Sequence, residues 1–141
     1  MAGKTFRLKV VTPTKMTVDV DATMVILQTT DGQIGVLAGH EHVVTTLDHG
    51  ILRYYQDEKI ESIAVFGGYA DISQSEVIVL ADIAERPEEI DAERARQAKE
   101  RANRYLNEQR AEMDTMRAKI ALRKSLVRLE LSGQPLTPDK K

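Results

Sequence analysis

The sequence contains no cysteine and no tryptophan, and aromatic residues make up only 4% of its 141 residues. Without cysteine, the chain cannot form a disulfide, a cysteine-based zinc site or a thiolate nucleophile. Long apolar runs are also missing. Residues 1–9 do not read as a targeting segment, and the most apolar window, residues 63–70, is too short to span a bilayer and contains two glycines. We therefore expect any membrane association to go through a protein partner, without direct insertion.

The net charge is only −2, but the two halves of the chain differ in sign. Residues 1–89 carry 7 Lys+Arg and 14 Asp+Glu, a net of −7, and residues 90–141 carry 13 and 8, a net of +5. This asymmetry indicates either two modules with different partners or ordinary surface solvation. A nucleic-acid role is not expected, because only the second half is basic and no aromatic series interleaves its charges.

Before about Pro87, the pattern of apolar residues is that of β-strands. Phe6, Leu8 and Val10 alternate with polar residues, and residues 24–27 form a short continuous apolar run. Turn signals follow at short intervals, including Asp31-Gly32, His49-Gly50, Asp57-Glu58, Gly67-Gly68 and Ser73-Gln74-Ser75. Connections this short cannot hold crossover helices, so we predict a β-sandwich or barrel.

After Pro87, the apolar spacing becomes helical. One face of a first helix carries Ala95, Ala98, Ala102, Tyr105 and Leu106. A second helix is predicted over residues 111–131, where Met113, Ile120 and Val127 recur every seven residues, and the break between the helices falls at residues 107–110. Glycine and proline then end the regular structure. We therefore predict an α+β chain, mainly β, with a β-sandwich over residues 1–86, an antiparallel helical hairpin over 87–132 and a polar tail over 133–141.

Several common catalytic and binding motifs fail on spacing or context. Gly3-Lys4-Thr5 ends like a phosphate-binding loop, but no strand precedes it and the first glycine of the motif would fall before residue 1. His40 and His42 could share one strand face, but no further ligands cluster near them, so turn or core histidines are the simpler interpretation. The glycines at 32, 35 and 39 do not have dinucleotide spacing. No serine has a matched base nearby in the sequence.

The start of the first helix is the most informative constellation. Asp91 is a good N-cap, and a surface pair with Arg94 one turn later is the simplest role for both. Arginines also recur seven residues apart at 94 and 101, and Arg117, Lys124 and Arg128 fall on one stripe of the second helix. Two cationic rows near exposed helix N–H groups would suit a polyphosphate, while a solvated basic face remains the alternative.

Taken in order, the motifs resemble one known family over nearly the whole chain. Three stretches are similar to sequence motifs of the epsilon subunits of bacterial F-type ATP synthases. They are Gly32-Gln33-Ile34-Gly35-Val36-Leu37-Ala38-Gly39-His40, Val65-Phe66-Gly67-Gly68-Tyr69 and Val79-Leu80-Ala81-Asp82. Ile90-Asp91-Ala92-Glu93-Arg94-Ala95 resembles the nucleotide motif of that family at the start of its first helix.

The resemblance implies a fold, partners and a place in the cell. The sandwich would have ten strands and contact the gamma subunit and the c-ring of the rotor. The hairpin would permit turnover when folded, and would inhibit ATP hydrolysis when extended to the alpha/beta catalytic hexamer. The chain itself would be a non-catalytic subunit of the central stalk, coupling rotation to a proton-translocating enzyme. It would lie peripherally at the cytoplasmic side of the cell membrane.

The resemblance also implies a ligand. No cofactor would be required, and ATP would be a regulatory ligand of the folded hairpin, with the part of Mg²⁺ left open. Lys124 stands where such members place an arginine, and lysine keeps the charge but loses the bidentate fork. The residues that match the family's ATP site are Glu85, Ile90, Asp91, Arg94, Ala95, Arg101 and Arg128.

The composition of the first helix gives a physical reason for such a switch. A buried methyl contributes about 0.8 kcal/mol, so Ala95, Ala98 and Ala102 contribute about 2–3 kcal/mol. Tyr105 and Leu106 add to this, and ordering the hairpin costs part of it, so the net docking energy should be small. A ligand at about 100 times its dissociation constant adds about 2.7 kcal/mol to the state that binds it. ATP could therefore decide the state of the hairpin. Two other functions stay open on sequence grounds: a free-standing nucleotide sensor and an independent enzyme on a β-sandwich, although no catalytic set is visible for the latter.

Overall fold

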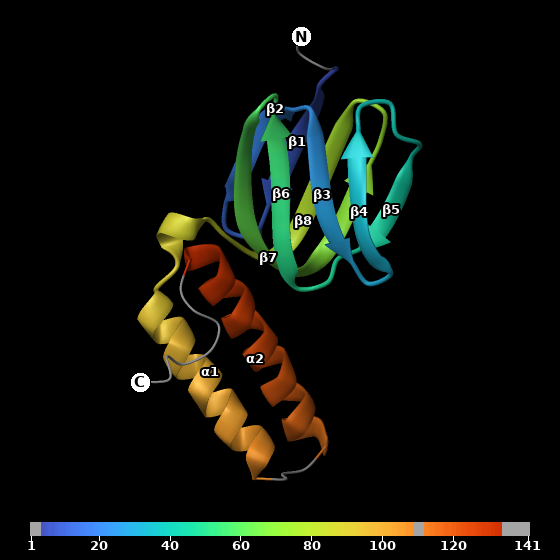
Figure 1. The fold of residues 1–141 in the computed structure, drawn as a ribbon. Helices are drawn as coiled ribbons and strands as arrows, with labels where there is room; N and C mark the ends of the chain where they lie inside the picture. Colours follow the sequence, from blue (N-terminus) through green and yellow to red (C-terminus); the bar gives the residue numbers. More distant parts are fainter. Residues whose placement is uncertain (1–3, 109–111, 134–141) are drawn as a thin grey trace. The chain divides into compact units, whose positions relative to one another are not determined.

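The computed structural model describes residues 4–108 and 112–133, without the side chains of residues 112–114. The predicted tail over 133–141 lies outside these residues except for Gly133. The described residues form eight strands, one turn of 3-10 helix and two α-helices (Figure 1). In chain order they are β1 (Phe6–Val11), β2 (Met16–Ala22), β3 (Met24–Thr29), β4 (Gly32–Leu37), β5 (Val43–Thr46), β6 (Gly50–Gln56), β7 (Lys59–Ile72), β8 (Glu76–Glu85), η1 (Pro87–Glu89), α1 (Ala92–Asn107) and α2 (Glu112–Ser132).

The chain divides into two compact units, Met1–Arg86 and Pro87–Lys141. The first is a β-sandwich, and the second holds α1 and α2 as an antiparallel pair (Figure 1). The predicted fold class, a sandwich followed by a two-helix hairpin, is confirmed. Among the described residues, no helix combines the length and the apolar character that crossing a bilayer requires.

The strands of the sandwich are hydrogen-bonded in the order β2-β1-β8-β7-β6-β3-β4, with β5 attached to β7. Every pair is antiparallel except β1 with β8. The long strand β7 pairs with β6 through its first half, residues 59–65, and with β5 through its second half, residues 69–72. One strand therefore takes part in both layers of the sandwich.

Two glycines in the middle of β7 mark the change of partner. Gly67 and Gly68 have φ values of 76° and 110°, which residues with a Cβ atom rarely adopt. The sequence predicted a turn at these glycines and the resemblance implied ten strands, and both predictions are wrong for the described residues. Positive φ bends β7 here without ending it, so that a single 14-residue strand runs where a turn would have made two.

The core of the sandwich lies between the two layers and follows the predicted alternation. In β1, for example, Phe6, Leu8 and Val10 are buried while Arg7 and Lys9 are half-buried. Side chains from every strand except β5, together with Leu47 directly after β5, meet in one apolar cluster. Its fully buried members include Leu8, Val10, Val25, Leu27, Val36, Ile63, Ile72, Val77 and Val79.

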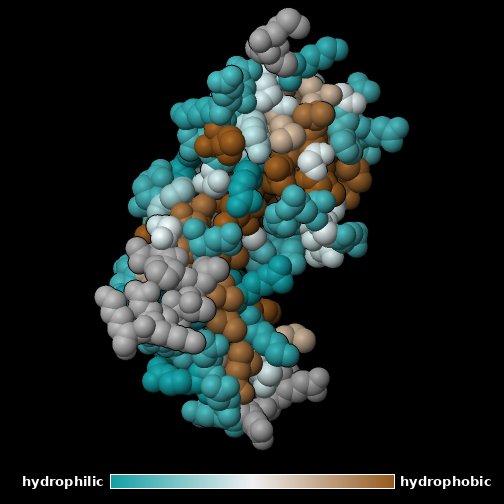
Figure 2. Space-filling model, in the orientation of Figure 1, coloured by the Kyte–Doolittle hydropathy of each residue, from teal (hydrophilic) through white to brown (hydrophobic). Residues whose placement is uncertain are grey.

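The outer faces of the sandwich carry two apolar rows that the strand register defines. The first row crosses four strands, and Leu37 and Ile60 at its ends are 59% and 54% exposed. Figure 2 shows hydrophobic residues gathered over β3, β4 and β6, where this row lies. We call it the β4–β7 row, and its members are Leu37, Met24, Tyr55 and Ile60. We call the second the β2–β7 row, and its members are Met16, Val11, Leu80 and Tyr69.

The helix ends lie close to the positions predicted from the sequence. Asp91 caps the start of α1, and α1 ends at Asn107, inside the predicted break. Gly133, with φ 80°, follows the last residue of α2, and its N–H donates to the carbonyl of Glu130 at 3.2 Å. A glycine in this conformation ends a helix without steric cost. The face of α1 predicted to be apolar is buried at Ala95 and Ala102 and half-buried at Ala98.

Candidate binding site of the helical hairpin

The candidate site begins at the N-terminus of α1. Asp91 has an extended backbone, with φ −88° and ψ 101°, and its carboxylate accepts a hydrogen bond from the backbone N–H of Arg94 at 3.0 Å. This is the geometry of an N-cap, which satisfies one of the N–H groups left free at a helix start. Just before it, the N–H of Ile90 donates to the carbonyl of Pro87 at 3.2 Å, which closes η1. The cap and η1 together fix where α1 begins.

The guanidinium of Arg94 is not used by the cap. Asp91 bonds to the backbone of Arg94, so the predicted side-chain pair between the two residues is wrong. Arg94 and Arg101 are exposed, and neither forms an ion pair with any described carboxylate. In contrast, Arg96 pairs with Glu93, and that hydrogen bond raises the pKa of Arg96. The first helix therefore offers at least two guanidinium groups that are available to an anion.

A cavity of about 370 Å³ opens between α1 and α2. Its floor is formed by Ala102 and Ala118, which are only 5% and 7% exposed. The antiparallel packing of the helices brings Arg101 of α1 and Arg117 of α2 to the same cavity. The full lining is Ala98, Arg101, Ala102 and Tyr105 from α1 and Arg117, Ala118 and Ala121 from α2.

The structure brings together some of the predicted site residues and separates others. Arg101 lines the cavity, whereas Asp91 and Arg94 lie at the start of α1. Arg128 is half-buried near the end of α2, and the antiparallel arrangement places this end beside the start of α1 (Figure 1). The contact of α2 with η1 agrees with this placement. Glu85 ends β8 and belongs to the sandwich unit.

The remaining two predicted residues are apolar, and both lie at the start of α1. Ile90 precedes the cap and is half-buried, and Ala95 is 4% exposed. The N–H of Ala95 donates to the backbone carbonyl of Asp91 at 3.0 Å, the first hydrogen bond of the helix. Ala95 is therefore a packing position of the hairpin, and only Ile90 of these two residues is partly exposed.

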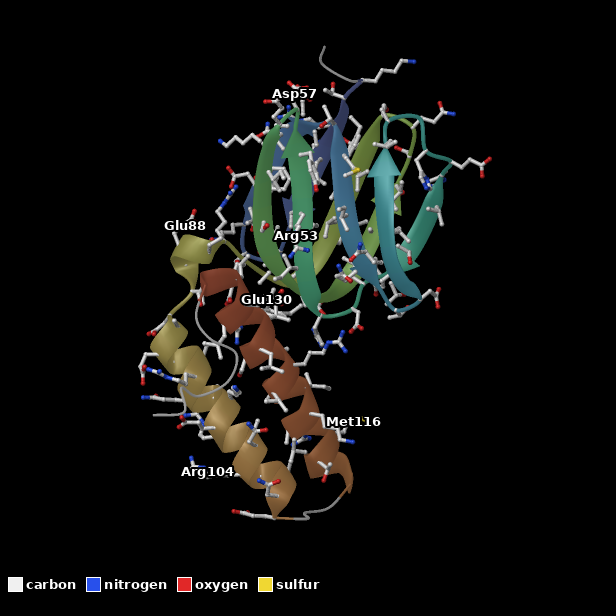
Figure 3. The ribbon with its side chains drawn as sticks, in the orientation of Figure 1. Arg53, Asp57, Glu88, Arg104, Met116 and Glu130 are labelled. Atoms are coloured by element: carbon white, nitrogen blue, oxygen red, sulfur yellow. The ribbon has the colours of Figure 1, made fainter. Side chains whose placement is uncertain are left out.

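The sequence did not predict the cavity between the two helices. The spacing of cationic residues placed Arg117 on a stripe with Lys124 and Arg128, but no pattern paired a residue of α2 with Arg101 or Tyr105. Figure 3 shows Arg104 and Met116 projecting away from the contact between the helices, and Met116 is 62% exposed. The available signal was the alanines that occur in both helices, since small side chains leave room where two helices face each other.

The histidines do not form a metal centre. His42 Nε2 lies 2.9 Å from Asp71 Oδ1, which joins β7 to the segment before β5. Within residues 4–108 and 112–133, no group of three or more His, Cys, Asp or Glu side chains is arranged to hold a metal ion.

Two family models match the chain in sequence order. Residues 5–87 match the β-sandwich domain of the ATP synthase delta/epsilon chain, and residues 88–133 match its long α-helix domain. The junction between the two matches falls within two residues of the division between the two units, after Arg86.

Curated relatives cover both domains. A protein of Desulforamulus reducens named ATP synthase epsilon chain is 42% identical over 128 residues, which cover 91% of this chain and 97% of the relative. A protein of the same name from Symbiobacterium thermophilum is 40% identical over 127 residues, 89% of this chain and 91% of the relative.

Solved structures resemble the fold as well. A chain in the cryo-EM structure of the Euglena gracilis mitochondrial ATP synthase (OSCP/F1/c-ring) matches with a TM-score of 0.79 and 27% identity, covering 92% of this chain and 82% of that chain. A chain from the Tetrahymena thermophila enzyme matches with a TM-score of 0.65 at 11% identity over 94% of this chain and 99% of that chain, a likeness in fold alone.

Proposed function

The chain belongs to the family of ATP synthase delta/epsilon chains, and we propose that it is the epsilon subunit of the central stalk of an F-type ATP synthase. It is not the catalytic subunit of that enzyme. The observation that carries this proposal is the match to both family domains, in order, over residues 5–133. As part of a rotor that couples proton flow to ATP synthesis, the protein would lie peripherally on the cytoplasmic face of the cell membrane.

In this function, the sandwich holds the subunit on the rotor. The gamma subunit and the c-ring are the proposed partners, and the two exposed apolar rows support contacts of this kind. The β4–β7 row and the β2–β7 row each place four apolar side chains in register on an outer face. Contiguous apolar patches on a protein surface mark sites of interaction with other proteins. Two separate rows are sufficient for two partners.

The hairpin is the regulatory part of the proposal. In its folded state it binds ATP through Arg94 and Arg101 and the cap of α1, and in its extended state it reaches the alpha/beta catalytic hexamer and inhibits ATP hydrolysis. Two guanidinium groups without a described carboxylate partner support an anionic ligand. The full set proposed for the nucleotide is Glu85, Ile90, Asp91, Arg94, Ala95, Arg101 and Arg128.

Isothermal titration of the whole chain with ATP, with and without Mg²⁺, tests the nucleotide site. We expect Arg94→Ala to weaken ATP binding about tenfold or more, because a hydrogen bond to a charged group contributes about 1.5–3 kcal/mol. Arg104→Ala is the matched control, since it removes an exposed arginine of the same helix that is outside the proposed set. Equal ATP affinity in Arg94→Ala and the parent protein would argue against this site.

A truncation tests the inhibitory role of the hairpin. We expect a chain that ends at Pro87 to assemble with the remaining subunits, because the sandwich forms a compact unit that ends at Arg86. The ATP hydrolysis rate of the assembled enzyme should then rise above that of the enzyme with the full chain. If inhibition is undiminished after truncation, the hairpin is not the inhibitory element, whereas the family assignment is unaffected.

A further inference from the structure

The cavity between α1 and α2 has a chemical character of its own. Four alanine methyl groups and the ring of Tyr105 make most of its lining apolar, and the two cations Arg101 and Arg117 come from opposite helices. Its volume of about 370 Å³ falls within the range of about 300–1,000 Å³ that is usual for small-molecule sites. Only Arg101 is shared with the nucleotide set proposed above.

The charges in the cavity favour a ligand with a single anionic group. Neither Arg101 nor Arg117 forms an ion pair or hydrogen bond with another described side chain. A guanidinium binds a carboxylate through two parallel hydrogen bonds. A triphosphate would bring about four negative charges to two cations, and the alanine methyl groups of the lining offer no hydrogen bond to the remaining charge. A carboxylate on an apolar body satisfies both kinds of lining.

We propose that this cavity binds a small amphiphilic monoanion, an alkyl or aryl carboxylate. Its apolar body lies on Ala98, Ala102, Ala118 and Ala121, and its carboxylate is held by Arg101 and Arg117. Because the ligand contacts both helices, it stabilises by mass action the state in which α1 and α2 are packed together. This inference rests on the geometry of the hairpin and not on the proposed nucleotide site, with which the cavity shares Arg101.

Decanoate, below its micelle concentration, is a suitable probe, and alanine-methyl NMR of the full chain gives a local readout. We expect decanoate to shift the methyl signals of the four cavity alanines and to leave those of Ala22 and Ala70, in the sandwich core, unchanged. Decylamine carries the same alkyl chain with the opposite charge and should not produce these shifts. Shifts confined to the sandwich, or equal shifts with both probes, would overturn the proposal.

Two substitutions separate the apolar and the cationic parts of the site. Ala121→Leu fills the cavity with a side chain of high helix propensity, and we expect it to abolish the shifts at the remaining three alanines. Ile120→Leu conserves volume at the neighbouring, outward-facing position and should leave binding unchanged. Replacing both arginines, Arg101→Gln with Arg117→Gln, should weaken binding about tenfold or more. Decanoate binding that survives Ala121→Leu with unchanged affinity would exclude this cavity as its site.

Discussion

The sandwich and the hairpin bury side chains of different size. Of the twelve largest fully buried side chains among the described residues, eleven lie in the sandwich, and only Leu129 lies in the hairpin. The other buried side chains among the described residues of the hairpin are small or medium-sized: Ala95, Ala102, Ala118, Ser125 and Val127. Since the free energy of burial scales with apolar area, the two units are stabilised to different degrees. This difference suits a rigid platform joined to a helix pair that can change its state.

A buried hydroxyl strengthens the contrast. Ser125 of α2 is 1% exposed, and its Oγ donates a hydrogen bond to the carbonyl of Ala121 in the same helix at 2.9 Å. The hydrogen bond satisfies the group but adds no contact across the helices. A leucine or valine at this position would contribute more apolar area. The hairpin is therefore held together by a thin apolar seam, and the following predictions test how far its stability falls below that of the sandwich.

The largest effect is expected in the core of the sandwich. Leu27 is 1% exposed within the main apolar cluster, so Leu27→Ala should lower the free energy of unfolding of the sandwich by about 2–5 kcal/mol. In the hairpin, Ala102→Gly should lower helix stability by about 1 kcal/mol. Urea unfolding, followed at signals of each unit, measures both. If Ala102→Gly cost as much as Leu27→Ala, the contrast between the units would be wrong.

The bend in β7 gives the next prediction. A Cβ added at Gly68 would lie 2.0 Å from the backbone oxygen of Leu80, and the φ of 110° is unfavourable for alanine. We expect Gly68→Ala to destabilise the sandwich by about 3 kcal/mol, since a backbone atom cannot rotate away. Gly35→Ala is the control, because an added Cβ there meets nothing within 4 Å. Equal midpoints in urea for the two variants would show that β7 tolerates a side chain at its bend.

In the hairpin, the N-cap of α1 should have a smaller and more local effect. Asp91→Ala removes the acceptor of the Arg94 N–H. We expect this substitution to lower the stability of α1 by about 1 kcal/mol. Asp91→Asn keeps an accepting oxygen and should remain close to the parent. Amide hydrogen exchange would show faster opening of α1 with unchanged protection in the sandwich. A loss of protection that extends into the sandwich would mean that the two units unfold together.

Local signals in the sequence predicted much of the fold. The two-residue turn at Asp57-Glu58 joins β6 to β7, and Asp91 caps α1, because each signal acts through neighbouring backbone groups. The Gly67-Gly68 pair was misinterpreted as a turn. Glycine shows only that positive φ is available, and a turn and a bend within a strand both require it.

The site was predicted less completely than the fold. Apolar residues of α2 occur around most of the helix, so the spacing of Ile120 and Val127 did not show which face packs on α1. In the structure, Ile120 is 40% exposed. The placement of Arg101 and Arg117 at one cavity depends on the register between two antiparallel helices. That register is set by side-chain packing across the pair, and no local pattern in either helix contains it.

The smallest effect is expected where the units are alike, in their exposed ion pairs. Arg7 donates to Asp19 at 2.7 Å between β1 and β2, and this hydrogen bond lowers the pKa of Asp19 below its ordinary value. Its contribution to stability is therefore present above the pKa of the unfolded aspartate and is lost as the pH falls through the lower, folded value.

Carboxyl NMR titration should show the pKa of Asp19 rising toward its ordinary value in Arg7→Gln. Lys9→Gln should change it less, because Lys9 acts on Asp19 only through its charge, whereas Arg7 also donates a hydrogen bond to it. Exposed pairs contribute little to folding, so the stability of both units should hardly respond to the loss of Arg7 or of Arg96 in the hairpin. The pattern of buried side chains attributes the difference in stability between the two units to their cores. A clear loss of stability in either variant would show that surface ion pairs contribute to that difference as well.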